Sequence, residues 1–228
     1  VHTPYTYDFD DPLGQNDWSK MFVSKLLETG KGNCHSLPYL YKILADELGI
    51  PCHFAFAPNH LYIKLFSEKT GWYNIELTNG TFPIDAWIMA SGYISTDAIR
   101  NGLYMDTLSE KQMLANCLLD LAHGYQYKFG KDSINFVILC CNTLLKYHPV
   151  NVNALLTKVE AQKHHIQSLM KAHNVKSPKK LLDNKFIKEM YDEMTVIYTT
   201  LHDLGYNQMP KEMYLQWLKT PPAVKKGF

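Results

Sequence analysis

The chain has 228 residues, a length that suits one large domain or two small ones with a real hydrophobic core. Hydrophobic residues make up 46% of the sequence, charged residues make up 20%, and the formal net charge is +1. This ordinary balance gives no support to a nucleic acid, an anionic membrane or a polyanionic substrate as partner. No uninterrupted apolar run approaches ~20 residues, so we expect no membrane span in this chain.

The first half of the chain predicts a mixture of helix and sheet. In chain order we expect an irregular segment over residues 1–18, helices over 19–28 and 34–48, and strands over 52–58, 60–66 and 72–78. Gly49 and Pro51 end the second helix. Pro38 removes a backbone donor near the start of that helix, so its first turn is expected to be irregular.

The second half of the chain predicts only helices. A capping box at Ser109–Gln112 opens the first of them. The expected helices run over about residues 110–129, 132–148, 152–173 and 182–204, and a short one starts at 210. We therefore expect an α+β domain over residues 1–100 and a helical domain over 106–228, with antiparallel neighbouring helices because the loops are short.

The five cysteines do not form a disulfide pattern. Their number is odd and two of them, Cys140 and Cys141, are adjacent inside an apolar helix, where we expect them to pack in the core. No Cys/His spacing indicates zinc, and no acidic loop has the ligand spacing of a calcium site. The sequence therefore implies no metal and no cofactor.

Cys34, His60 and Glu76 are the candidate reactive residues. Cys34 stands where a helix begins, and a helix N-terminus lowers the pKa of a thiol because it favours negative charge. A histidine partner favours the thiolate further, and a carboxylate holds the imidazole in the correct tautomer. If the turn after the second strand centres near Lys69, His60 faces Thr78 and is diagonal to Glu76; a shift of one pair places His60 directly opposite Glu76. In either register the two side chains share one face of the sheet.

The stretches KGNCHSLPYLYKILADELGIP, APNHLYIKL and GWYNIELTNG resemble the transglutaminase-like branch of the papain-like cysteine superfamily. The resemblance covers roughly residues 8–85, and it is closest to a bacterial branch whose core is followed by tetratricopeptide-like helices. It implies a helix packed on a small antiparallel sheet, with Cys34 as nucleophile, His60 as base and Glu76 as the orienting acid. The family more often has Asp at the third position, so Glu76 departs from the pattern by one methylene.

The helical half admits two interpretations. NFVILCCNTLLKYHPVNVNALLTKVEAQ resembles the junction between tetratricopeptide-type helices, with Pro149 between them. The alternative is a helical bundle that covers the α+β core.

Two functions follow from these residues. The first is cysteine-dependent acyl transfer on an amide or ester, as a protease, peptidase, deamidase or transglutaminase-like enzyme acting on a peptide or protein. The second is a non-catalytic binding module that recognises a peptide or protein partner. Because the chain begins at Val1 rather than Met, we expect a processed or trimmed chain. A cytoplasmic and a periplasmic or extracellular location both stay open, as does the oligomeric state.

Other polar residues have simpler interpretations. Asn59, beside His60, is expected to form a turn, with a second role as donor near an oxyanion. His35 is expected to point away from Cys34, and His53 to pack or cap. His164 and His165 are adjacent on a polar helix and are expected to be surface residues rather than metal ligands.

Overall fold

The computed structural model describes residues 3–220. The chain divides into two compact units. The first unit consists of the described residues up to Glu110 together with those from Asn207 onward, and the second consists of Lys111–Tyr206.

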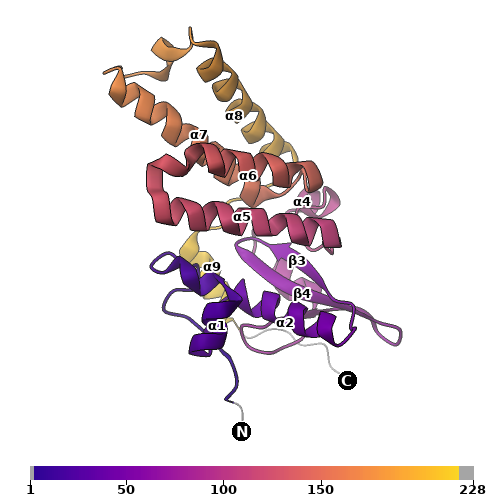
Figure 1. The fold of residues 1–228 in the computed structure, drawn as a ribbon. Coiled ribbons are helices and arrows are strands. Elements are labelled where there is room, and N and C mark those ends of the chain that lie inside the picture. The colour runs from indigo at the N-terminus through magenta and orange to yellow at the C-terminus, as the bar shows by residue number, and fades with distance from the viewer. Residues whose placement is uncertain (1–2, 221–228) are drawn as a thin grey trace. The chain divides into compact units, whose positions relative to one another are not determined.

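The first unit is built on a small antiparallel sheet with strand order β3-β4-β5. Its elements are β1 (Thr6–Tyr7), η1 (Trp18–Met21), α1 (Val23–Thr29), β2 (Lys31–Gly32), α2 (Ser36–Glu47), β3 (His53–Ala57), β4 (His60–Ser67), β5 (Gly71–Ile75), α3 (Asp85–Met89), α4 (Thr96–Arg100) and α9 (Lys211–Lys219). Helix α2 packs against β4, and β1 pairs in parallel with β2 (Figure 1). The unit is therefore mixed helix and sheet, as its sequence pattern predicts.

The register of the sheet follows from its two turns. Ala57 pairs with His60 across the first turn, and Ser67 pairs with Gly71 across the second. The β4–β5 pairing thus centres on Lys69, the first of the two predicted registers. Strand β5 ends at Ile75, earlier than predicted, because Glu76 instead forms an isolated bridge with Thr81 that closes a turn. Almost every side chain of β4 is buried, so this strand is the centre of the core.

The stretch between α4 and Glu110 packs on the free edge of β3. The Met105 N–H donates to the Phe56 carbonyl at 2.9 Å, and the Leu108 N–H donates to the Phe54 carbonyl at 2.8 Å. Leu103, Met105 and Leu108 are buried. These contacts shield one edge of the sheet from solvent.

The C-terminal helix α9 belongs to the first unit, whereas the sequence predicts one helical domain over residues 106–228. The reason is the apolar face of α9, since Tyr214, Trp217 and Leu218 are buried among residues of the first unit. Of the helices predicted for the second half, those between Lys111 and Tyr206 form the second unit.

The second unit is made of α-helices joined by short turns. Its elements are α5 (Glu110–Phe129), whose first residue still belongs to the first unit, η2 (Gly130–Ser133), α6 (Ile134–Tyr147), α7 (Val152–Ala172), η3 (Pro178–Leu181) and α8 (Lys185–Asp203). Cys140 and Cys141 lie in the core of this unit with Leu119, Val137 and Leu144, as predicted. Within residues 3–220, no helix is both long and apolar enough to cross a membrane.

Candidate functional site

Cys34 lies in the turn that joins β2 to α2, and its neighbours lock that turn. The Asn33 side-chain oxygen accepts hydrogen bonds from the backbone N–H groups of His35 and Ser36, both at 3.0 Å, and so fixes the turn before the helix. Regular helix begins at Ser36, two residues after the predicted start. A Cβ at Gly32 would meet side-chain atoms of Leu26, Leu37 and Ser36 at 2.9 Å, so a larger residue does not fit there.

His60 is the first residue of β4 and follows a two-residue turn. Pro58 and Asn59 form this turn, and Asn59 has a positive φ of 57°. These residue types suit the two central positions of a type II turn. Because the turn is tight and β4 is central, the His60 backbone is held at the edge of the core, and only 5% of the residue is exposed.

Glu76 meets His60 at hydrogen-bond distance. His60 Nε2 and Glu76 Oε2 are 2.7 Å apart, and Glu76 Oε1 accepts from the Thr78 backbone N–H at 2.8 Å. The bridge to Thr81 fixes the Glu76 backbone. Glu76 therefore reaches His60 from beyond the end of β5, in a position diagonal to His60.

The three side chains perturb one another's pKa values. Burial favours the neutral thiol of Cys34, but the hydrogen bond and positive charge of His60 outweigh burial, and the pKa of Cys34 is lowered. Burial opposes the imidazolium, but the Glu76 carboxylate and Cys34 raise the pKa of His60 to about 10. Burial also favours a neutral Glu76, yet the charge of His60 lowers its pKa. The cluster thus favours a thiolate, an imidazolium and a carboxylate side by side.

Two tyrosines complete this cluster, and sequence reasoning missed both. The Tyr214 hydroxyl lies 3.1 Å from His60 Nδ1 and 3.4 Å from the Tyr7 hydroxyl. Both hydroxyls also hydrogen-bond the Cys34 thiol. Burial, followed by the negative charge of Cys34, raises the pKa of each tyrosine, so both hydroxyls remain protonated beside the sulfur.

Helix α9 covers the imidazole. The Trp217 ring stands edge-on to His60, with ring centres 5.3 Å apart, and stacks on Trp87 at 4.6 Å. The Trp217 indole N–H donates to the Trp87 carbonyl oxygen. Cys34 is 7% exposed and Tyr214 is fully buried, so the cluster is formed but closed to bulk solvent.

The remaining candidate residues have structural partners. The Asn59 side chain donates to the Met209 carbonyl at 2.8 Å rather than facing the cluster. His35 Nδ1 lies 2.9 Å from the Met21 carbonyl, and His53 Nδ1 lies 3.4 Å from that of Leu108. His164 pairs with Glu160 on its own helix. Among residues 3–220, no group of three or more His, Cys, Asp or Glu side chains is placed to hold a metal ion.

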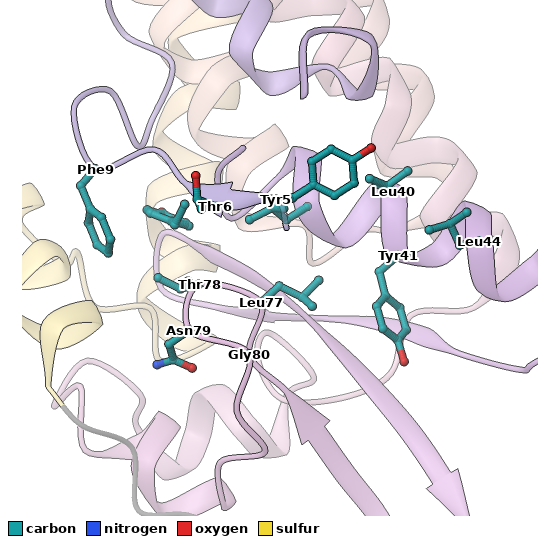
Figure 2. Close-up of a pocket in the computed structure, with 12 residues that line it drawn as sticks. Tyr5, Thr6, Phe9, Leu40, Tyr41, Leu44, Leu77, Thr78, Asn79 and Gly80 are labelled. Carbon is teal, nitrogen blue, oxygen red and sulfur yellow. The ribbon is translucent and has the colours of Figure 1, made fainter. Parts of the chain in front are cut away.

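A cavity of about 570 Å³ adjoins the cluster. It is lined by Tyr5, Thr6, Tyr7, Phe9, Leu37, Leu40, Tyr41, Leu44, Leu77, Thr78, Asn79 and Gly80. Figure 2 shows the loop of Leu77–Gly80 across the hollow from Tyr5, Leu40 and Leu44. Tyr7 and Thr78 belong both to the cavity wall and to the hydrogen-bond network of the cluster.

No protein-family model matches the chain, and neither curated proteins nor solved structures include a match.

Proposed function

We propose that this protein is a cysteine-dependent acyl-transfer enzyme acting on an amide or ester of a peptide or protein. The observation that carries the proposal is the 2.7 Å contact between His60 and Glu76, made in a buried cluster where His60 lowers the pKa of the Cys34 thiol. Burying a thiolate, an imidazolium and a carboxylate together is costly, and such perturbed groups concentrate at reactive sites. A cysteine in the turn before a helix, an antiparallel sheet against which that helix packs, a histidine on its central strand and an acid just after its next strand also resemble a papain-like or transglutaminase-like core.

In the acylation step, the Cys34 thiolate attacks the carbonyl carbon of the substrate. A C–S bond forms and the carbonyl electron pair moves to oxygen, where the Cys34 backbone N–H at the amino end of α2 is the donor we assign. The imidazolium of His60 then gives its proton to the leaving amine or alcohol as the C–N or C–O bond breaks. A thioester on Cys34 results.

In the second step, water or an amine attacks this thioester. His60, now neutral, accepts the proton of the attacking group, and the thiolate leaves as the C–S bond breaks. Glu76 holds the imidazole in place and stabilises its charged form in both steps. Attack by water gives hydrolysis, and attack by an amine gives transamidation.

The second candidate function is a binding module without catalysis. The closure of the cluster favours it, because Tyr214 and Trp217 of α9 occupy the space next to His60. In that case the core would recognise a peptide or protein partner through its surface.

Trapping of a thioester separates the two functions. We expect p-nitrophenyl acetate to acylate wild-type protein at Cys34, seen as the acyl mass on that peptide and as released nitrophenolate. The Cys34→Ala variant should not release nitrophenolate above background, whereas Cys117→Ala, which removes an exposed thiol, should behave as wild type. Acylation confined to Cys117, or none at all in folded protein, would favour the binding module.

A further inference from the structure

The cavity beside the cluster has the size and lining of a ligand site. Its volume of about 570 Å³ lies within the range of small-molecule sites. Leucine and aromatic side chains form most of the wall, and the lining residues include no Asp, Glu, Lys, Arg or His. A charged group placed there would lose hydration without gaining an ionic partner. The chemistry of the wall therefore selects a neutral, apolar group.

The side chain of Tyr7 separates the cavity from Cys34, which is not itself among the lining residues. Tyr7 lines the cavity and hydrogen-bonds the Cys34 thiol, while Thr78 lines it and donates to Glu76. Leu37, in the first turn of the helix that follows Cys34, forms another part of the wall. A group held in this cavity thus lies one side chain away from the reacting sulfur.

The rim of the cavity leaves apolar surface in contact with water. Phe9 is 49% exposed and Leu44 is 54% exposed. A bound apolar group would cover part of this surface, which adds a favourable contribution to binding.

We propose that this cavity binds a neutral apolar or aromatic group of the acyl donor, adjacent to the carbonyl that Cys34 attacks. This inference rests on the acyl-transfer function proposed above and specifies its substrate class. The occupant is the acyl side of the substrate, for example a large hydrophobic side chain next to the scissile amide.

Three p-nitrophenyl esters test the proposal: the acetate, the hexanoate and the mono-ester of adipic acid. In each case the Cys34 thiolate forms a C–S bond, the C–O bond breaks and nitrophenolate leaves. After division by the rate of each ester with free N-acetylcysteine, we expect the hexanoate to acylate Cys34 at least about tenfold faster than the acetate. The adipate, which has the same chain length but ends in a carboxylate, should lose this advantage.

A matched pair of variants tests whether the preference for hexanoate over acetate arises in this cavity. Leu44→Asp places a charge at the rim and should abolish the advantage of hexanoate over acetate. Ile43→Asp adds the same charge one residue away, at a side chain that is 48% exposed and outside the cavity lining, and should keep that advantage. An equal hexanoate preference in both variants, or no preference in wild type, would overturn the proposal.

A binding measurement keeps this test separate from that of catalysis. In the Cys34→Ala protein, hexanamide should shift the NMR signals of Leu40 and Leu77, and Leu44→Asp should remove the effect. Such shifts without any acylation of Cys34 would reject acyl transfer and retain a site for a neutral apolar ligand. Acylation without chain-length preference, and without hexanamide shifts, would retain acyl transfer and reject this cavity as its subsite.

Discussion

Cys34, His60 and Glu76 are shielded from water, so their charges are set by one another and by the two tyrosines. For each of the three side chains, burial favours the neutral form and a neighbouring group favours the charged form. Removing His60 would therefore leave two buried groups without the positive charge that favours their anionic forms, and an uncompensated buried charge costs several kcal/mol in comparable cases. The pKa of the Cys34 thiol is thus the most direct measure of how these groups affect one another.

The pH dependence of Cys34 alkylation reports this coupling. Since the pKa of Cys34 is lowered and that of His60 is raised to about 10, the alkylation rate by iodoacetamide should rise through a midpoint below that of an ordinary thiol. In Glu76→Gln the imidazolium loses its partner, so the pKa of His60 falls and the midpoint for Cys34 moves to higher pH. Peptide mapping at each pH separates Cys34 from the exposed Cys117. Identical midpoints for the two thiols would contradict the ion pair.

Tyr214 acts on the same thiol through its hydroxyl. Tyr214→Phe removes the donor to Cys34 and the contact with His60 Nδ1. We expect the alkylation rate at neutral pH to fall about threefold to tenfold, since one hydrogen bond contributes roughly 1 kcal/mol.

Tyr62→Phe is the matched control for Tyr214→Phe. The Tyr62 ring stacks near His60, with centres 6.4 Å apart, but its buried hydroxyl has no hydrogen-bond partner in the described part of the chain. Its removal should leave the alkylation rate unchanged. Equal effects of the two variants would show that ring packing, and not the Tyr214 hydroxyl, controls the thiol.

At the scale of the elements, the β2–α2 turn places Cys34, and Gly32 sets its geometry. Gly32→Ala would press a methyl group against Leu26, Leu37 and Ser36, each 2.9 Å away. We expect a loss of about 1–3 kcal/mol in the free energy of unfolding, measured in urea, because overpacking forces the turn to shift. The turn carries Cys34 with it, so alkylation at neutral pH should slow as well.

Gly49, after the end of α2, provides the comparison for Gly32. It has a positive φ of 67°, and a methyl group added there would meet no neighbouring atom within 4 Å. Gly49→Ala should cost about 1–2 kcal/mol through backbone strain alone, with the alkylation of Cys34 unaffected. Slower alkylation in Gly49→Ala would mean that loss of stability, rather than displacement of the turn, explains the Gly32 result.

At the scale of the whole molecule, the chain leaves the first unit at Glu110 and returns to it at Asn207. A chain that ends after Tyr206 loses Tyr214 and Trp217, whose removal uncovers His60 and Trp87. We expect such a chain to lose hydrogen-exchange protection in β3–β5 and to retain it in α6 and α7. A chain that ends after Thr220 keeps α9 and should retain this protection in β3–β5. Equal loss in both units would contradict the division of the chain.

The local pattern of the sequence predicted the longer elements and the shared sheet face of His60 and Glu76. Alternating strands and a turn centred on Lys69 were enough to place Glu76 on the face of His60, because hairpin register follows from turn length. Capping residues and glycines likewise predicted most helix ends in the second unit, whereas the short helices α3 and α4 of the first unit were not predicted. The two-residue strands β1 and β2 escaped prediction because a strand of that length has no periodicity.

Only the tertiary structure decided what surrounds the thiol. Tyr7 and Tyr214 meet although 207 residues separate them, and no spacing in the sequence encodes that contact. The local sequence pattern predicts only that Tyr214 and Trp217 share the apolar face of a short helix. Their burial against His60 depends on which unit α9 joins. The cavity arises from β1, α2 and the loop after β5 together. Packing between distant segments, rather than local propensity, therefore set the closure of the cluster and the lining of the cavity.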